Sequence, residues 1–391
     1  MQNFFETHDI FIGEKSETEF RQSNNTYQDG TTPLYRDVNG KLWGMSGHSH
    51  LGTMAMFCGS CVDDMKKLYD IEMNFCTGHA EYAFNGIRYP EGVAARGSVW
   101  PFGLYICPGT HRFFCLFHNE SGWCGRGTAY DSYGLCETPK GDSDFRHVGL
   151  MHSNNEGKTW TFDRWVLTAE KPCFTQRYNP GAGQVHGQPY GVISLGSGDF
   201  TLYVEPDGDF MYLFYNIIEF DMERADWNGC HVYVARSRKR TDGFFGDFVK
   251  YYDKSFCESG IMGRETPIVR NAWHARMAYS EKYHLYFLSS TRVTTGQKKS
   301  GFVDDVMDVR TSTDIVNWSE PYAVLENGAP FGNHYLAMVS AKTEGQPNIL
   351  SDDDFAILAN HNGTDVIRYL AAFVKKTVPA SSTGSEADAA Q

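Results

Sequence analysis

Three acidic residues, Asp29, Asp199 and Glu265, stand in local contexts that suit acid–base chemistry. Each lies next to a glycine or two residues from one, and each precedes an apolar stretch with the composition of a β-strand. Glycine permits the tight turn that directs a neighbouring side chain toward a ligand. Because a pair of carboxyl groups can donate and accept a proton during bond cleavage, these three residues form the candidate catalytic set.

Each of these acids also has a structural interpretation. An Asp beside Gly commonly bonds its own backbone in a β-turn, which would account for Asp29 and Asp199. Glu265 follows Arg264 directly and would form a surface ion pair with it. Glu120, at the end of another apolar stretch, is an alternative acid.

A second group of residues suits recognition of a hydroxyl-rich ligand. Neutral imidazole and guanidinium groups hydrogen-bond hydroxyls, and an indole ring stacks on the apolar face of a sugar ring. His48 and His50, two residues apart, would share one strand face as a metal pair, but no third ligand follows from the sequence, so no metal or other cofactor is expected. The candidate binding residues are His48, His50, Arg96, Glu120, His186, His274, His334 and Trp43.

The elements that must position these residues are short strands. Runs of about five aromatic and β-branched residues alternate with Gly, Asn or Asp turns, and helical periodicity is confined to 61–70, where we expect one short helix. The clearest runs are 41–45, 103–107, 113–117, 210–215, 231–235, 284–288 and 355–359. The sequence therefore predicts an all-β protein.

A weak repeat of strands favours a five-bladed β-propeller among the all-β folds that control their sheet edges. Two units close with a Ser, a polar turn and a Trp, at 153–160 and 312–318, where the turn side chain can satisfy backbone N–H groups while the Trp packs between sheets. We expect one domain over 1–377, long loops over one channel mouth, and a disordered tail over 378–391. The five units are 31–59, 99–160, 199–248, 266–318 and 333–374.

Composition excludes several classes of function. The 391 residues are 15% aromatic and 21% charged, which argues against global disorder, and the formal charge of −13 opposes nucleic-acid binding. No apolar run reaches the roughly 18 residues of a membrane span, and no export signal is visible, so the sequence as given is expected to be cytoplasmic. The ten cysteines contain one CxxC motif, Cys58 and Cys61, for which zinc or redox chemistry is the alternative to reduced core thiols.

The segment 153–160 resembles the Asp-box turn of sialidase-type propellers, with Asn155 where the usual Asp would stand. Together with 29–43, 196–215, 234–237 and 312–318, it makes the chain resemble the five-bladed β-propeller glycoside hydrolases, the group of arabinanases, β-xylosidases and anhydrogalactosidases. The resemblance covers roughly 25–375 and lies at the level of pattern.

This resemblance implies a glycoside hydrolase that cleaves an oligosaccharide derived from a polysaccharide. Its members use two Asp and one Glu from different blades, which implies Asp29 as base, Asp199 as modulator of the acid's pKa, Glu265 as acid, and inversion at the anomeric carbon. The alternatives on the same scaffold are a non-catalytic carbohydrate-binding propeller, a sialidase-like enzyme with a Tyr nucleophile, and a polysaccharide lyase using His274 and Tyr279. Oligomeric state, sugar and linkage do not follow from the sequence.

Overall fold

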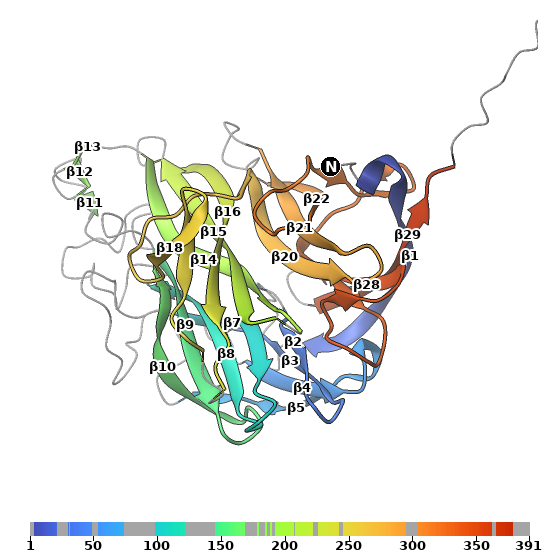
Figure 1. Cartoon of the computed structure of the whole chain (residues 1–391), viewed down its shortest axis with the longest axis horizontal. Helices are drawn as coiled ribbons and strands as arrows, with labels where there is room; N and C mark the ends of the chain where they lie inside the picture. Colours follow the sequence, from blue (N-terminus) through green and yellow to red (C-terminus); the bar gives the residue numbers. More distant parts are fainter. Residues whose placement is uncertain are drawn as a thin grey trace, which may run out of the picture.

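The computed structural model describes most of the chain (Figure 1). The described residues are 4–21, 30, 32–48, 54–73, 98–121, 145–168, 178–179, 184–185, 188–189, 192–206, 208–221, 226–241, 245–294, 303–361 and 365–377. Over these residues the protein is built from β-strands, with only two 3₁₀ turns, η1 (Phe4–Glu6) and η2 (Val62–Asp64). The all-β prediction is confirmed, and within this part of the chain no helix is long and apolar enough to cross a bilayer.

Twenty of the described strands fall into five groups of four antiparallel strands, named sheets 1 to 5 here. Hydrogen bonds join sheets 2 and 3, together with β6, β18 and β19, into one 11-stranded sheet, and β27 pairs with sheet 4. Sheet 1 holds β2 (Leu34–Arg36), β3 (Leu42–Ser46), β4 (Ala55–Gly59) and β5 (Lys66–Asp70). Sheet 2 holds β7 (Ser98–Ile106), β8 (Phe113–Ser121), β9 (Phe145–Ser153) and β10 (Thr159–Thr168). Sheet 3 holds β14 (Val192–Val204), β15 (Phe210–Asp221), β16 (Asp226–Arg238) and β17 (Val249–Tyr252).

Sheets 4 and 5 complete the set. Sheet 4 holds β20 (Ala272–Ser280), β21 (Leu285–Val293), β22 (Val303–Ser312) and β23 (Tyr322–Ala323). Sheet 5 holds β26 (His334–Ser340), β28 (Asp354–His361), β29 (Asp365–Lys375) and β1 (His8–Arg21). The short strands are β6 (Glu72–Met73), β11 (Tyr178–Asn179), β12 (Gln184–Val185), β13 (Gln188–Pro189), β18 (Ser255–Ser259), β19 (Val269–Arg270), β24 (Leu325–Glu326), β25 (Ala329–Pro330) and β27 (Ile349–Leu350).

The first strands of the sheets line the centre of a ring. In this order, β2 contacts β7, β7 contacts β14, β14 contacts β20, and β20 contacts β26. A single parallel bridge between Gly196 and Arg146 links the inner strand of sheet 3 to sheet 2. A ring of radially arranged antiparallel sheets is a propeller, in which each sheet packs against two neighbours.

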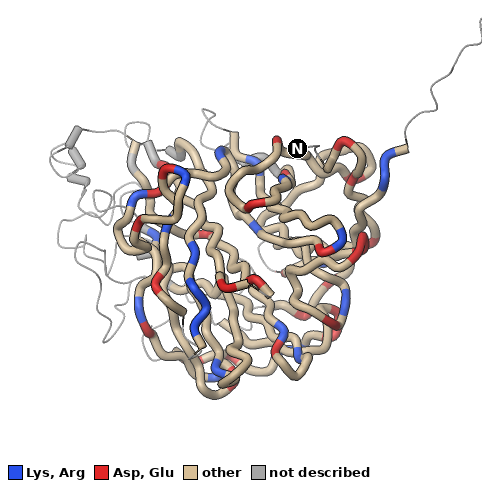
Figure 2. Tube along the Cα trace, in the orientation of Figure 1, with Lys and Arg blue, Asp and Glu red and all other residues tan. Residues whose placement is uncertain are grey.

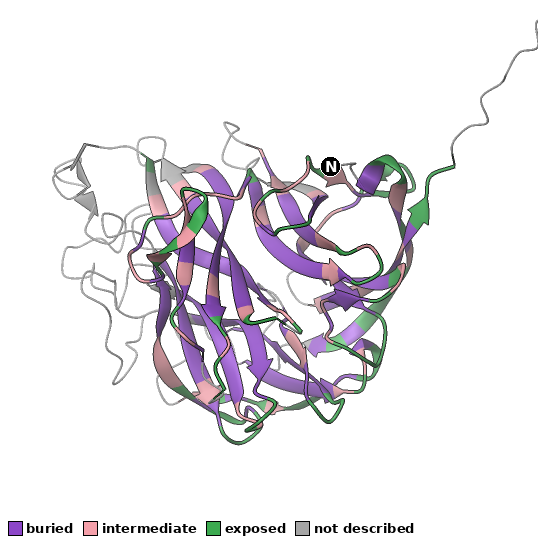
Figure 3. Cartoon of the chain, in the orientation of Figure 1, coloured by how far each residue is buried: buried purple, intermediate pink, exposed green. Residues whose placement is uncertain are grey.

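Most of the described strands are buried (purple in Figure 3), and their apolar residues form separate clusters at the interfaces between sheets. Adjacent residues on a strand point to opposite faces, so Phe113 packs toward sheet 1 and Phe114 toward sheet 3. Phe287 and Leu288 divide in the same way between sheets 5 and 3. Because both faces are covered, runs such as 113–117 are apolar throughout instead of alternating.

The ring is closed by the N-terminal strand. Strand β1 pairs antiparallel with β29, from His8 opposite Lys375 to Arg21 opposite Asp365, and the dark-blue β1 lies beside the red β29 in Figure 1. Phe20 of β1 then packs against Phe57 of sheet 1, so sheets 5 and 1 share a core. No strand was predicted for this N-terminal segment from the sequence.

The two predicted closing turns are confirmed. Asn155 Oδ1 accepts the backbone N–H of Thr159 (3.0 Å), and the buried Trp160 donates its indole N–H to Gly157 O (2.8 Å). Asp314 plays the corresponding part before Trp318. The helix expected over 61–70 is wrong: η2 occupies only one turn, and Lys66–Asp70 extends as β5 because it pairs with β4.

Candidate active site at the centre of the ring

Three inner strands carry an irregularity at corresponding positions. The register shifts between Gly198 and Thr201 in β14, between Trp273 and Arg276 in β20, and between His334 and Ala337 in β26. Asp199, His274 and Tyr335 lie at these bulges, and all three adopt left-handed φ values, of 42°, 55° and 56°. A bulge redirects a side chain, and a left-handed non-glycine residue costs on the order of 1 kcal/mol or more, so the repetition marks a candidate functional site.

The three bulge residues meet across the channel. The Tyr335 hydroxyl donates to Asp199 Oδ1 (3.1 Å), and Trp273 Nε1 donates to Asp199 Oδ2 (2.9 Å). The His274 ring lies 3.9 Å from the Tyr335 ring and 4.3 Å from the Trp273 ring, measured between centroids. Both carboxylate oxygens of Asp199, a residue that is only 6% exposed, are therefore held by fixed donors.

The backbone around Asp199 is also held from sheet 2. The Asp199 backbone N–H donates to His118 Nδ1 (2.9 Å), which requires that this ring nitrogen carry no proton. A Cβ on Gly198 would stand 2.5 Å from His118 Cε1 and 2.8 Å from Arg146 Cδ, so only glycine fits here. The glycine of the Gly-Asp pair thus serves close packing in the channel.

Burial determines the charge of His274. The side chain is 3% exposed, and burial, reinforced by His334 and Arg146, holds its pKa well below the usual 6.5. The His334 ring lies 5.0 Å from the His274 ring. His274 is therefore a neutral imidazole at neutral pH, able to accept a proton or, in more acidic solution, to carry one.

Several of the predicted catalytic and binding residues join this cluster. Asp199, His274 and His334 lie together, and His48 stacks on Trp100, whose ring in turn meets His118 edge-on. Trp43 does not join it: its ring is fully buried against Phe113 and donates to Asp37, so Trp43 belongs to the core. Asp29, His50, Arg96 and His186 lie outside the described residues, as does the side chain of Glu120.

Glu265 has a different environment. Its Oε2 lies 2.6 Å from Lys250 Nζ and accepts the Tyr215 hydroxyl at 2.6 Å. Lys250 is fully buried and also donates to the carbonyls of Thr168 (2.7 Å) and Gly263 (3.0 Å). Glu265 therefore anchors the outer part of sheet 3 against the end of β10, and none of its described contacts reaches Asp199.

The alternative interpretation of Glu265, a surface ion pair with Arg264, is wrong. Arg264 instead pairs with Glu258, at 2.9 Å from its Nε. Glu258 belongs to β18, which pairs with β17. The ion pair therefore holds the segment that follows β18, in which Arg264 lies, against β18 itself.

Sequence reasoning missed Tyr335 and His118 as members of the site. Tyr335 follows the predicted His334 and precedes an apolar strand, the same context as Asp199 and His274, so its position was a usable signal. His118 gave no such signal, because it lies on the second strand of its sheet, and its contact with the Asp199 backbone spans 81 residues of sequence. In the described part of the chain no group of three or more His, Cys, Asp or Glu is placed to hold a metal ion.

No protein-family model matches the chain, and no curated protein matches it by sequence. Among solved structures, it is similar to a family 117 glycoside hydrolase of the marine bacterium Zobellia galactanivorans (11% identity, 93% of this chain and 90% of that chain, TM-score 0.49). It is also similar to a family-43 β-1,3-galactosidase with galactodeoxynojirimycin (13%, 93% and 96%, 0.47) and to a thermostable family-43 glycoside hydrolase (7%, 93% and 94%, 0.46). At these identities and scores, function has to be argued from the site residues themselves.

Proposed function

We propose that this protein is a glycoside hydrolase that cleaves a polysaccharide-derived oligosaccharide at the centre of the ring. The observation that supports it is the Asp199 carboxylate, held by Trp273 and Tyr335, whose rings also pack against the buried imidazole of His274. Glycosidic cleavage requires a group that donates a proton to the leaving oxygen and a base that takes one from the attacking water. The aromatic rings around Asp199 suit the apolar face of a sugar.

The roles are assigned as follows. Asp199 modulates the pKa of the acid, and Asp29 activates the water. We assign the acid to His274 instead of Glu265, because the Glu265 carboxylate is already engaged by Lys250 and Tyr215. As the glycosidic bond breaks, the proton of His274 passes to the leaving oxygen while Asp29 takes a proton from the water that adds to the anomeric carbon, with inversion.

A second function, polysaccharide lyase, is favoured by one contact. The lyase alternative needs a His/Tyr pair, and Tyr335 packs on His274, whereas Tyr279 lies further along β20 beside Tyr286. A neutral His274 would then remove the proton next to a uronate carboxylate, and the sugar at the leaving oxygen would depart by elimination. The two functions require opposite protonation states of His274.

The experiment is a screen of the purified protein on plant, algal and mycobacterial glycans, read by reducing-sugar release and by ultraviolet absorption of unsaturated uronates. We expect the wild type to release reducing sugar without new ultraviolet absorption. The Asp199→Asn variant should lose this activity, and the Asp209→Asn variant should keep it. Asp209 is a matched control because it lies in the turn before β15, with its side chain 73% exposed. Absorbing products would establish the lyase, and sugar binding without turnover would overturn both enzymatic proposals.

A further inference from the structure

Arg276 is a buried cation on an inner strand. Along β7, β14, β20 and β26, four of the five inner strands, Asp199 and Arg276 are the only residues of the types Asp, Glu, Lys and Arg, whereas such residues are frequent on the turns and outer strands (Figure 2). The fifth inner strand, β2, carries Arg36, whose guanidinium donates to backbone carbonyls. Asp199 is engaged by Trp273 and Tyr335. The Arg276 side chain, in a residue only 9% exposed, has no hydrogen-bond partner at Nε or Nη1 among the described residues.

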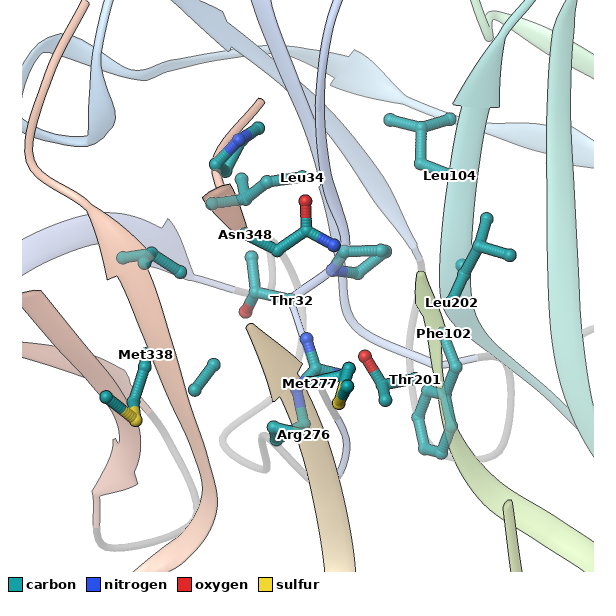
Figure 4. A pocket seen from close by; sticks show the side chains of 15 residues that line it. Thr32, Leu34, Phe102, Leu104, Thr201, Leu202, Arg276, Met277, Met338 and Asn348 are labelled. Atoms are coloured by element: carbon teal, nitrogen blue, oxygen red, sulfur yellow. The ribbon is translucent and has the colours of Figure 1, made fainter. Parts of the chain in front are cut away.

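Arg276 borders a small cavity. The lining residues from β14, β20 and β26 come two to four positions after the bulge residues Asp199, His274 and Tyr335. The volume of the cavity is about 40 Å³, and Figure 4 shows the Arg276 side chain directed toward the space bordered by Thr32, Thr201 and Asn348. The Thr32 hydroxyl is also buried without a hydrogen-bond partner among the described residues. No Asp or Glu belongs to the described lining of this cavity.

Charge and size together define what this cavity suits. Burial lowers the pKa of Arg276 to about 9, so the guanidinium is still positive at neutral pH. A buried cation without a counter-charge is strongly disfavoured, and an anion beside it relieves that cost. A volume of about 40 Å³ accommodates a few waters or one small ion, because a water needs roughly 10 to 15 Å³ on this measure.

We propose that this cavity binds one monovalent anion of halide size, held by the Arg276 guanidinium and by the Thr32 hydroxyl and Asn348 amide as further donors. The site is separate from the sugar-cleaving cluster in its ligand and in its residues, so it does not depend on the proposed hydrolase or lyase activity. The same positive charge could receive the carboxylate of an acidic sugar, and the experiment separates the two sources.

The direct test is crystallography of the wild-type protein in sodium bromide, at a wavelength where bromide scatters anomalously. An anomalous peak within hydrogen-bond distance of the Arg276 guanidinium is expected. A map of equal quality with bromide peaks elsewhere and none at Arg276 would overturn the proposal.

The solution test is thermal unfolding in bromide, chloride and glucuronate at equal ionic strength. For the wild type, Tm should rise with halide by roughly 2 °C per tenfold increase above the dissociation constant, because the ligand binds only the folded state. Arg276→Met should abolish the halide response, Thr32→Val should move it to higher concentration, and Arg238→Met, an exposed control, should retain it. An equal halide response in Arg276→Met, or an Arg276-dependent response to glucuronate, would each overturn the halide assignment.

Discussion

The hydroxyl of Tyr335 lies 3.1 Å from Asp199 Oδ1, which joins the inner strand of sheet 5 to that of sheet 3 although sheet 4 stands between them. Such a contact is possible only at the axis of the ring, where inner strands from non-adjacent sheets converge. Both residues reach it from bulges in left-handed backbone. The geometry of the candidate site thus depends on closure of the whole ring.

Replacing Tyr335 by Phe should impair turnover more than stability. The change removes one hydrogen bond to a carboxylate, worth about 1.5 to 3 kcal/mol, so kcat/KM should fall by roughly 10- to 100-fold if that bond positions Asp199 for the reaction. Steady-state kinetics and thermal unfolding measure the two effects. Tyr322→Phe is the matched control, because Tyr322 donates to Asp9 at 3.0 Å away from the channel; an equal loss of activity in both variants would contradict a role specific to the site.

His274 should make stability depend on pH in mildly acidic solution. Its folded-state pKa is lowered, so between that value and about 6.5 the unfolded chain binds a proton that the folded protein does not. The free energy of unfolding should therefore fall as the pH drops below 6.5, by up to about 1.4 kcal/mol per pH unit, and be unaffected by this group above 6.5. Denaturant unfolding at several pH values should show a shallower slope for His274→Asn, and an unchanged slope for the exposed His284→Asn.

The pH dependence of turnover distinguishes the two proposed reactions. A His274 that donates its proton is active only when protonated, so hydrolysis should rise as the pH falls toward its lowered pKa. A His274 that accepts a proton loses activity over the same interval. The acidic limb of kcat/KM, compared between the wild type and His274→Gln, reports the direction, and a limb unaltered by the substitution would remove His274 from both mechanisms.

Glu265→Gln should lower the stability of the fold and leave the chemical step intact. Neutralising Glu265 leaves Lys250 as an uncompensated buried cation, which typically costs about 3 to 5 kcal/mol. The double variant Glu265→Gln, Lys250→Met should recover much of this stability, and both proteins, once folded, should keep kcat within a few-fold of the wild type. A loss of kcat of roughly 100-fold in the stable double variant would instead restore Glu265 as the acid.

The two ends of the chain should tolerate truncation very differently. Deleting 1–21 removes β1, leaves β29 without its outer partner and removes Phe20 from the core between sheets 5 and 1, so soluble expression should be lost. Deleting 378–391, a tail rich in Ser and Ala, should leave Tm unchanged, since the tail offers no apolar residues for burial beyond Val378 and its alanines. Soluble yield and thermal unfolding of the two deletions make the comparison.

Local patterns in the sequence determined the strands and the turns between them. Phe113 to Phe117 is strand-forming in any fold that buries both faces, and the Ser-to-Trp turns close on themselves through side chains a few residues apart. Such features depend on neighbours along the chain, so they could be predicted, as could the positions of Asp199, His274 and His334 near the openings of their sheets. The partner of β1 could not, because β29 lies more than 300 residues away.

Asp199 and Glu265 show what only the tertiary structure decided. Both stand near a glycine and before an apolar stretch, and the sequence treats them alike. Asp199 falls on a bulge of β14, the strand at the axis, while Glu265 falls in the connection between β18 and β19 and meets Lys250. Which strand lies innermost is determined by the packing of sheets that are distant in sequence, because this arrangement of strands buries apolar surface around the ring. The residues adjacent to Asp199 or Glu265 in the sequence therefore do not determine it.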